Sequence, residues 1–413
     1  MKHFVIFLVI ITVSCTNKVE KKIDEFTYPP EWELHEAIWT DYNYEPYNGV
    51  SNDEARLVLI NHLAKYVKTN VIYDNDSLMN LGKQQLIALS ANMDSIEFVK
   101  LPFWSSWMRD PLMFITDGQE NKILDFEWSC YGGAYGGCED DLRGLLSNNL
   151  QDLKGYERDS TGLFFEGGAI EVSNNTILAY KALATQRNPN RTIKEVEEIL
   201  LNKLGKEQII WLDEFPLVDK PGIKIDSYFG QGANGHIDVT TRFLNDSTIL
   251  ATVISEEDRY KNSILEYDYG VFQKNLAQLK AARQPNGRPY YIETIDAPDY
   301  SLFEFPYQLN EGLYYGLLSE SSRKGAKLGD SIIMIPALEY ANFTITNGVI
   351  IASEYWKEGM PESEKRKDQK LRAILEKYFP NRDIITMDAL PINWGGGGVH
   401  CRTQQEPKLN SNN

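Results

Sequence analysis

The sequence predicts an α/β fold, because segments with helical periodicity alternate with short strand-like segments along the chain. Residues 53–67 (DEARLVLINHLAKYV) carry apolar side chains at helical spacing and lead into the strand-like NVIYD. A second helical pattern around Lys83–Leu89 leads into the strand-like SIEFVKLP. No low-complexity linker follows residue 27 and no sequence repeat is visible, so we expect one continuous domain over residues 28–408 and a short polar tail over 409–413.

Two later segments repeat this alternation. Thr192 and Glu195 have the spacing of a capping box at the start of the helical pattern TIKEVEEILLNKLG, and Gly205 suits the C-terminal end of that helix. The strand-like QIIWLD follows it. Residues 363–379 (SEKRKDQKLRAILEKYF) predict another helix, and DIITMD predicts the strand after it.

The composition favours a large folded protein that does not bind nucleic acid. A chain of 413 residues with 42% hydrophobic residues can bury a large core. Its formal net charge of −17 opposes binding to nucleic acid, which requires a basic face. The acidic balance suits a cationic substrate, although surplus carboxylates also keep a surface soluble.

The first residues predict a secretory signal. Residues 1–15 (MKHFVIFLVIITVSC) combine a cationic start, an apolar run that is too short to span a bilayer, and a small residue before Cys15. We expect lipidation of Cys15, with plain cleavage or an uncleaved anchor as the alternatives. Residues 16–27 are polar and charged and are typical of a tether. The mature protein is then expected in the cell envelope, periplasmic or surface-exposed, and in contact with membrane only through its N-terminal lipid.

The cysteines leave one thiol to explain. If Cys15 carries lipid, Cys130 and Cys138 are free to pair with each other, although the sequence does not show whether they do. Cys401 would then stand alone in an oxidising compartment. No CxxC or HExxH motif is present and the histidines are scattered, which argues against a structural zinc site.

Several charged residues stand among apolar neighbours. Asp110 lies in WMRDP, Glu166 lies in FFEGGAIEV, and His236 and Asp238 lie in the otherwise strand-like GANGHIDVTTRF. Taken singly, these residues also fit a buried ion pair, a turn and a hydrogen-bonded histidine. Taken together with Cys401, they supply a nucleophilic thiol, a proton carrier and carboxylates that can accept the N–H groups of a guanidinium.

The run of glycines before Cys401 has a chemical interpretation as well. Gly395–Gly398 can adopt backbone angles that other residues avoid, and they can approach a ligand without side chains in between. A flexible loop is the alternative interpretation of the same run.

These motifs resemble those of the agmatine deiminase and bacterial peptidylarginine deiminase family, within the pentein, or guanidine-modifying, superfamily. The resemblance extends in the family's order from PPEWELHEAIW (29–39) through WMRDP, FEGGAIEV, GHIDVTTRF and NFTITNG (342–348) to GGGGVHCRTQQEP. It therefore covers nearly all of the chain after the expected signal. The fold that it implies is a five-bladed α/β propeller of ββαβ units with pseudo-fivefold symmetry.

The resemblance also implies a mechanism. Cys401 would attack the guanidinium carbon while Asp110 and Asp238 grip the guanidinium nitrogens. Glu166 would hold and polarise His236, which would protonate the departing ammonia. Water activated by the same histidine would then hydrolyse the thiouronium. No metal or organic cofactor is needed for this reaction.

Further residues match the family's substrate site. Together with the two aspartates, the expected substrate-binding residues are Trp107, Asn342 and Gly398. Asn347 is a rival of Asn342 for its role, and His400 is expected to be structural rather than the base.

Two substrates fit the motifs. A site for arginine with its carboxylate would want a nearby cation, and the segment from Asp125 to Asp141 contains no arginine or lysine. The lack of a cationic residue in this segment favours agmatine as the substrate, hydrolysed to N-carbamoylputrescine and ammonia. This holds unless Arg143, Arg187 or Arg242 reaches the site from elsewhere.

Other interpretations stay open. Peptidylarginine, hydrolysed to peptidylcitrulline, is the alternative substrate. An envelope lipoprotein that binds guanidines or polyamines without turning them over is a second alternative. A homodimer is one option for the assembly.

Overall fold

The computed structural model describes residues 26–43, 51–102, 107–134, 138, 141–312, 315, 323 and 326–410. The expected signal, almost all of the expected tether and the end of the polar tail lie outside these residues. Within the described part of the chain, no helix combines the length and the apolar character that crossing a membrane requires.

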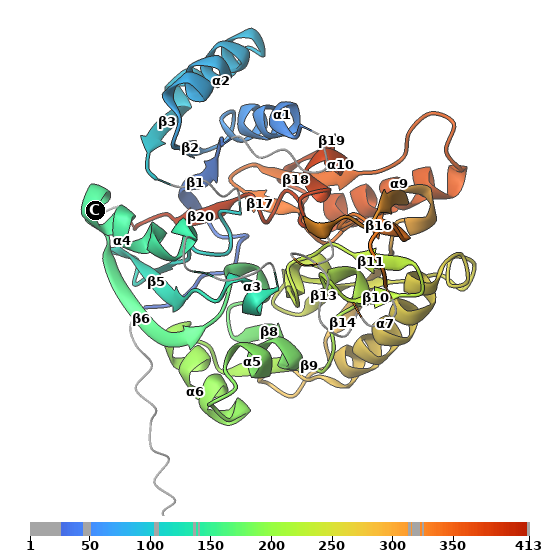
Figure 1. The fold of residues 1–413 in the computed structure, drawn as a ribbon. Coiled ribbons are helices and arrows are strands. Elements are labelled where there is room, and N and C mark those ends of the chain that lie inside the picture. Colours follow the sequence, from blue (N-terminus) through green and yellow to red (C-terminus); the bar gives the residue numbers. More distant parts are fainter. Residues whose placement is uncertain are drawn as a thin grey trace, which may run out of the picture.

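The protein is a mixed α/β structure in which one strand arrangement recurs (Figure 1). In four three-stranded sheets, an antiparallel pair is followed, after a helical connection, by a third strand parallel to the second. These sheets contain β4 (Phe114–Thr116), β5 (Asn121–Glu127) and β6 (Glu157–Phe164); β7 (Glu171–Val172), β8 (Thr176–Tyr180) and β9 (Gln208–Leu212); β12 (Thr241–Asn245), β13 (Thr248–Val253) and β14 (Tyr291–Asp296); and β17 (Thr344–Thr346), β18 (Val349–Glu354) and β19 (Asp383–Asp388).

A fifth sheet joins the two ends of the domain. Its strands are β20 (Gln404–Pro407), β1 (His35–Asp41), β2 (Lys68–Tyr73) and β3 (Ile96–Lys100). β20 runs antiparallel to β1, so the segment after Cys401 lies beside the segment that begins the domain. Figure 1 shows the remaining segments following one another around the molecule between these two strands.

The helices connect the parallel strands and cover the sheets. They are α1 (Asp53–Leu63), α2 (Asp76–Ala88), α3 (Cys130–Gly133), α4 (Leu146–Lys154), α5 (Lys181–Arg187), α6 (Ile193–Lys203), α7 (Ser263–Ala281), α9 (Glu362–Tyr378) and α10 (Leu390–Asn393). Their inner faces form the core with the sheets: Leu200 of α6 packs in one cluster with Ile177 of β8, and Leu371 of α9 packs in another with Ile350 of β18. Burial of these apolar side chains supplies the main driving force for folding.

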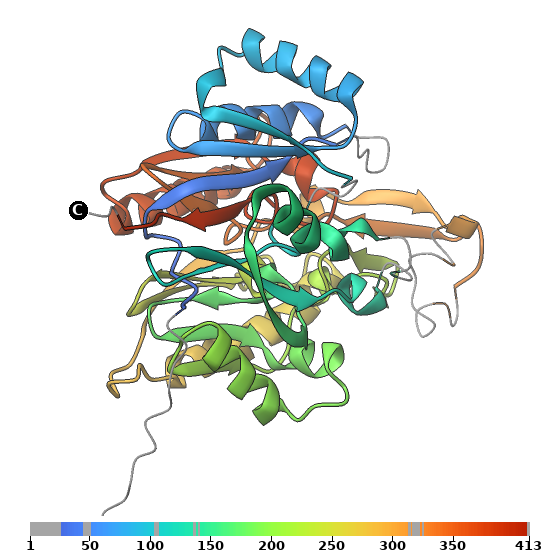
Figure 2. The same cartoon turned by 90° about the vertical axis from the view of Figure 1, so that its left-hand side faces the viewer.

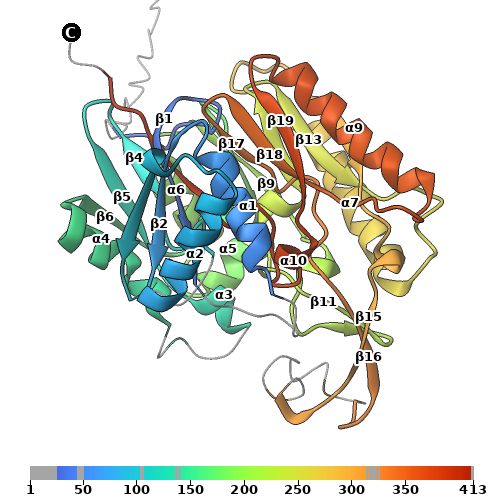
Figure 3. The ribbon, with the colours of Figure 1, turned by 90° about the horizontal axis from the view of Figure 1, so that it is seen from above.

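The sixth sheet is built differently. It contains β10 (Lys224–Ile225), β11 (Tyr228–Gly230), β16 (Ser331–Ile335) and β15 (Phe305–Gln308). β15 and β16 extend away from the rest of the molecule (Figures 2 and 3). The ring of Phe305 meets the ring of Trp394 edge-on at 5.4 Å, which connects this sheet to the glycine-rich segment that follows Trp394.

The structure confirms the predicted elements. The helical pattern of residues 53–67 forms α1, the pattern around Lys83–Leu89 belongs to α2, and the pattern of 363–379 forms α9. Thr192 and Glu195 form the predicted capping box of α6. Gly205 comes directly after the C-cap residue and has a positive φ of 63°, as expected of a glycine that ends a helix.

The prediction that GANGHIDVTTRF continues as a strand through its charged residues is wrong. Ile237–Val239 form a single 3-10 turn, and β12 begins only at Thr241. Asn234 and Gly235 both have positive φ, which interrupts an extended strand. The carboxylate of Asp219 accepts hydrogen bonds from the backbone N–H groups of Gly235 and His236, so those groups have no need of a neighbouring strand.

Candidate active site

The candidate catalytic residues share one structural position. Each lies in the segment just before the first strand of a sheet: Asp110 before β4, Glu166 before β7, His236 and Asp238 before β12, Asn342 before β17, and Cys401 before β20. Because these segments are loops and short turns, they carry polar side chains without interrupting a strand ladder. The fold thus brings together groups that are spread over almost 300 residues of sequence.

A small pocket lies beside two of these residues, Asp110 and Cys401. Its empty volume is about 250 Å³. Its lining residues are Trp107, Asp110, Tyr131, Gly232, Ala233, Gly395, Gly396 and Cys401. The part of it that the centre of a water-sized sphere can reach is only about 20 Å³, far below the roughly 300–1,000 Å³ of pockets for drug-sized ligands, so the pocket is narrow. No trio of His, Cys, Asp or Glu in the described ranges is arranged to hold a metal ion.

The Cys401 thiol is held by an asparagine. Cys401 is 2% exposed, and the amide Nδ2 of Asn342 donates to its Sγ at 3.1 Å. The Oδ1 of Asn342 accepts from the backbone N–H groups of His400 and Cys401 at 3.0 and 3.3 Å. Asn347 instead bonds the backbone of His35. The structure therefore places Asn342, and not its rival, at the site.

The glycines before Cys401 permit a close approach of backbone to side chain. Gly396 has a positive φ of 98°, which side-chain-bearing residues rarely adopt. A Cβ on Gly398 would lie 2.5 Å from the Oδ1 of Asn342, and the backbone of Gly398 bonds the Cys401 thiol. Gly398 thus lies beneath the nucleophile, while Gly395 and Gly396 line the pocket.

The surroundings of Cys401 oppose its ionisation in the empty pocket. Burial, followed by the negative charges of Asp238, Glu339 and Asp110, raises the pKa of the thiol well above its ordinary value. The Oδ2 of Asp238 lies only 3.5 Å from Sγ. A nucleophilic cysteine must lose its proton, so this site requires a positive charge near the thiol before it can react.

His236 lies between two carboxylates. Its Nδ1 is 3.5 Å from Asp110 Oδ1 and its Nε2 is 3.9 Å from Glu166 Oε2. Burial opposes charge on the ring, but Asp110, Asp238 and Glu166 outweigh this effect, and the pKa of His236 is raised. Neither ring nitrogen makes a hydrogen bond with another described residue. The imidazole is thus suited to give a proton to a group that enters the pocket.

Glu166 is held mainly by an arginine. Its Oε1 accepts from Arg187 Nε at 2.9 Å and from Ser129 Oγ at 3.2 Å. Its Oε2 has no hydrogen-bond partner among the described residues and faces His236. Glu166 therefore acts on His236 through its charge at 3.9 Å rather than through a hydrogen bond in the empty site.

Asp110 has a partner that the sequence did not single out. The hydroxyl of Tyr131 donates to Asp110 Oδ2 at 2.7 Å, and the Tyr131 ring lies 5.7 Å from that of His236. Burial raises the pKa of Asp110. Tyr131 has a positive φ and directly follows Cys130, which forms a disulfide with Cys138. The signal for Tyr131 in the sequence is its place in the motif CYGGAYGGC, directly after Cys130.

Asp238 is buried and ionised, and its two oxygens differ in their contacts. Burial disfavours its charge, but a hydrogen bond and the charge of His400, followed by those of His236 and Arg242, lower the pKa of Asp238. Its Oδ2 is 2.6 Å from His400 Nδ1. Its Oδ1 has no hydrogen-bond partner among the described residues and is buried. Such an oxygen can accept an N–H group of a cationic ligand.

The three arginines considered from the sequence occupy different places. Arg187 bonds Glu166, and Arg242 forms ion pairs in a buried network behind Asp238. Arg143 lies closer to the pocket, because its Nη1 is 3.1 Å from the hydroxyl of Tyr131 and its guanidinium lies 5.0 Å from that ring. Asp141 neutralises Arg143 at 2.5 Å.

Comparison with known proteins agrees with this geometry. Residues 27–407 match the profile of the Porphyromonas-type peptidyl-arginine deiminase family. The chain belongs to this family. It is similar to the agmatine deiminase of Pseudomonas syringae pv. tomato, with 25% identity over 403 residues that cover 94% of this chain and 96% of the relative. It is 25% identical over 393 residues to the agmatine deiminase of Stutzerimonas stutzeri, which cover 93% and 96% of the two chains.

Solved structures from related proteins share the mixed α/β fold. The agmatine deiminase of Enterococcus faecalis matches with a TM-score of 0.72 at 20% identity, over 94% of this chain and 97% of that one. The C. jejuni agmatine deiminase with substrate bound matches with a TM-score of 0.67 at 20% identity, over 92% and 96% of the two chains. The family match and the shared fold therefore agree with the resemblance that the motifs indicated.

Proposed function

We propose that this protein is a hydrolytic deiminase that converts agmatine to N-carbamoylputrescine and ammonia. The observation that carries the proposal is the pocket lined by the Cys401 thiol and Asp110, with His236 3.5 Å from Asp110 and Asp238 3.5 Å from Sγ of Cys401. Membership of the deiminase family and similarity to proteins named agmatine deiminase over nearly the whole chain support it.

The carboxylates account for binding. The free Oδ1 of Asp238 and the carboxylate of Asp110 offer acceptors for the N–H groups of a guanidinium. Trp107 and Tyr131 provide aromatic walls for the same cation. The positive charge that enters the pocket offsets the acidic groups around Cys401 and favours loss of the thiol proton.

The chemistry then proceeds in two steps. The thiolate of Cys401 bonds to the guanidinium carbon, and one nitrogen takes a proton from His236 and leaves as ammonia, which gives a thiouronium on sulfur. A water molecule next gives a proton to His236, and its oxygen bonds to the same carbon. The carbon–sulfur bond breaks, the proton on the added oxygen passes to solvent, and the thiolate and a neutral ureido product are released. Glu166 stabilises the charge on His236 in both steps.

The test is ammonia release by the purified chain without its first 15 residues on agmatine, free arginine and an arginine-containing peptide in parallel. Turnover of agmatine, lost in Cys401→Ser, is the expected result. Tight binding of agmatine without turnover by the native protein would instead support a guanidine-binding lipoprotein.

A peptidylarginine substrate is the second candidate, and Arg143 favours it. Although the segment from Asp125 to Asp141 has no arginine, the fold brings Arg143, two residues further on, against Tyr131 of the pocket. The guanidinium of Arg143 could bind the carboxylate of a peptide that ends in arginine if it exchanged Asp141 for the substrate. Turnover of the peptide that is lost selectively in Arg143→Gln would support this candidate, whereas turnover of agmatine alone would exclude it.

We also propose that five of the sheets correspond to the five ββαβ units of a pentein propeller. The recurring strand arrangement and the recurring place of the site residues before the first strand of each sheet support this assignment. An experimental structure in which the five sheets superpose by rotation about one axis through the pocket would test it.

An envelope location is a further part of the proposal. The signal-like residues 1–15 and Cys15 support lipidation, and the disulfide between Cys130 and Cys138 suits an oxidising compartment. Mass spectrometry of the mature N-terminus would test it: a lipid-modified Cys15 is expected, and an intact Met1 would contradict the proposal.

A further inference from the structure

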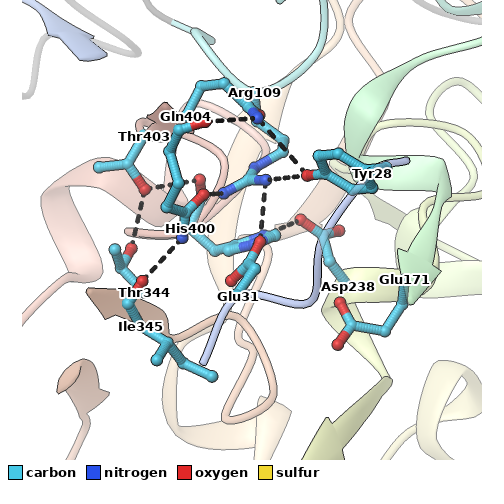
Figure 4. A network of polar contacts seen from close by, with 12 residues as sticks. Tyr28, Glu31, Arg109, Glu171, Asp238, Thr344, Ile345, His400, Thr403 and Gln404 are labelled. Carbon is cyan, nitrogen blue, oxygen red and sulfur yellow. Dashed lines mark hydrogen bonds and ion pairs between the residues drawn. The ribbon is translucent and has the colours of Figure 1, made fainter. Parts of the chain in front are cut away.

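Glu31 connects three segments of the proposed active site. It precedes β1, is 7% exposed, and has no place in the reaction described above. Its Oε1 lies 2.9 Å from Arg109 Nη1 and 2.7 Å from His400 Nε2 (Figure 4). Its Oε2 lies 2.7 Å from Arg242 Nη2. Burial opposes the charge of Glu31, but Arg109, His400 and Arg242 outweigh burial and hold the pKa of this carboxyl well below its usual range.

Each of these cations is close in sequence to a group that acts in the pocket. Arg109 is next to Asp110, and its backbone N–H donates to the carbonyl of Cys401 at 3.1 Å. Arg242 follows Asp238 by four residues, and His400 is next to Cys401. One carboxylate from the start of the domain therefore contacts all three segments.

His400 links Glu31 to Asp238, the carboxylate that faces the substrate. Its Nδ1 lies 2.6 Å from Asp238 Oδ2, while its Nε2 lies 2.7 Å from Glu31 Oε1 (Figure 4). A neutral imidazole has one N–H group, so two short contacts to two ionised carboxylates require a proton on both ring nitrogens. The ring then fixes Oδ2 of Asp238, and Oδ1 is the oxygen left for the guanidinium.

We propose that Glu31 is a positioning residue for the deiminase reaction, because it holds His400 doubly protonated and His400 in turn orients Asp238. The inference rests on the proposed function. Without the Glu31 charge, the ring loses one of its two carboxylate partners, and Asp238 is no longer held by a charged donor. Since a misplacement of about 1 Å can cost roughly 100-fold in rate, the effect on turnover should be large although Glu31 does not touch the substrate.

The kinetic test compares two variants that each remove one buried carboxyl group. Glu31→Gln should lower kcat/KM for agmatine by about 100-fold, mainly through kcat. Glu171→Gln is the matched control, because Glu171 also pairs with Arg242, at 2.8 Å, but no dashed line joins it to His400 in Figure 4. The control should stay within about threefold of the native protein. Equal losses in both variants would overturn the proposal.

A double-variant cycle separates positioning from general support of the fold. His400→Gln removes the link while leaving Glu31 with its two arginines. If Glu31 acts through His400, adding Glu31→Gln to His400→Gln should cost less than about threefold further. If Glu31 acts only by neutralising the arginines, the two losses should multiply, and the proposal fails.

A spectroscopic test does not depend on activity. In the native protein labelled with ¹⁵N-histidine, one histidine, assigned by its loss in His400→Gln, should show two ring N–H resonances shifted strongly downfield. A single ring N–H on His400 would overturn the proposal outright. If two are present but agmatine is not turned over, the proposed function fails while the contact from Glu31 to Asp238 stands.

Discussion

Substitution of Asp238 by asparagine should change activity and thiol reactivity in opposite directions. The variant removes the carboxylate that faces the guanidinium. It also removes a negative charge that, after burial, is the main cause of the raised pKa of Cys401. Loss of binding should therefore come together with a more acidic thiol. A variant that only disturbs the fold is not expected to lower activity and at the same time raise the reactivity of Cys401.

The structure gives the magnitudes. Removing one partner of a buried ion pair costs about 3–5 kcal/mol, and each 1.36 kcal/mol corresponds to about tenfold, so kcat/KM for agmatine should fall by roughly 100-fold to several thousandfold. Sγ of Cys401 and Oδ2 of Asp238 are 3.5 Å apart. At an effective dielectric constant of about 20, two unit charges at that distance repel by about 5 kcal/mol. His400 screens part of this repulsion, so we expect alkylation of Cys401 at pH 7 to accelerate at least about tenfold.

The assay uses iodoacetamide, which is neutral, so that its entry does not depend on the charge removed. The rate of modification of Cys401 in the free protein is followed by mass spectrometry. Asp246→Asn, on the exposed turn between β12 and β13, is the control and should react like the native protein. Alkylation of Asp238→Asn at or below the native rate would refute the electrostatic reasoning, whatever happens to kcat/KM.

Three further outcomes are expected. Cys401→Ser should abolish ammonia release with an unchanged melting temperature, and residual turnover would remove Cys401 as the nucleophile. Tyr131→Phe removes a hydrogen bond to Asp110, which is worth about 1.5–3 kcal/mol for a charged acceptor. The kcat/KM for agmatine should therefore fall roughly 10- to 100-fold. An unchanged value would show that this hydrogen bond does not contribute to the reaction. Burial lowers the pKa of Lys206 to about 7. The pKa of a lysine in the unfolded chain is near 10.4. Between pH 7 and about 10.4 the unfolded chain therefore holds a proton on Lys206 that the folded chain lacks. The free energy of unfolding consequently rises with pH across this range and is lowest below pH 7. Lys206→Met should thus raise the melting temperature at pH 6 by several degrees and progressively less toward pH 10, and a gain independent of pH would contradict this reasoning.

Much of the site could be anticipated from local sequence. WMRDP, FEGG, GHID and GGGGVHC each placed a charged or reactive residue among apolar neighbours or glycines, and the fold brings these residues within a few ångströms of one another. Two relations within the site could not be anticipated. Nothing in NFTITNG distinguishes Asn342 from Asn347, because the choice depends on which of them comes within reach of Sγ once β17 is paired. His400 was expected to be structural, but its part in orienting Asp238 depends on Glu31, which is 369 residues away.

The sequence by itself determined the α/β alternation, the capped helix α6 and the set of reactive side chains suited to a guanidinium. Helix periodicity, caps and reactive residue types are properties of neighbouring residues. Only the tertiary structure decided the electrostatics. Whether a buried thiol is a thiolate, which nitrogen of a histidine carries a proton and which carboxylate oxygen remains free all depend on distances of a few ångströms between segments that are remote in sequence. Those distances are set by the packing of the sheets, and no local pattern records them.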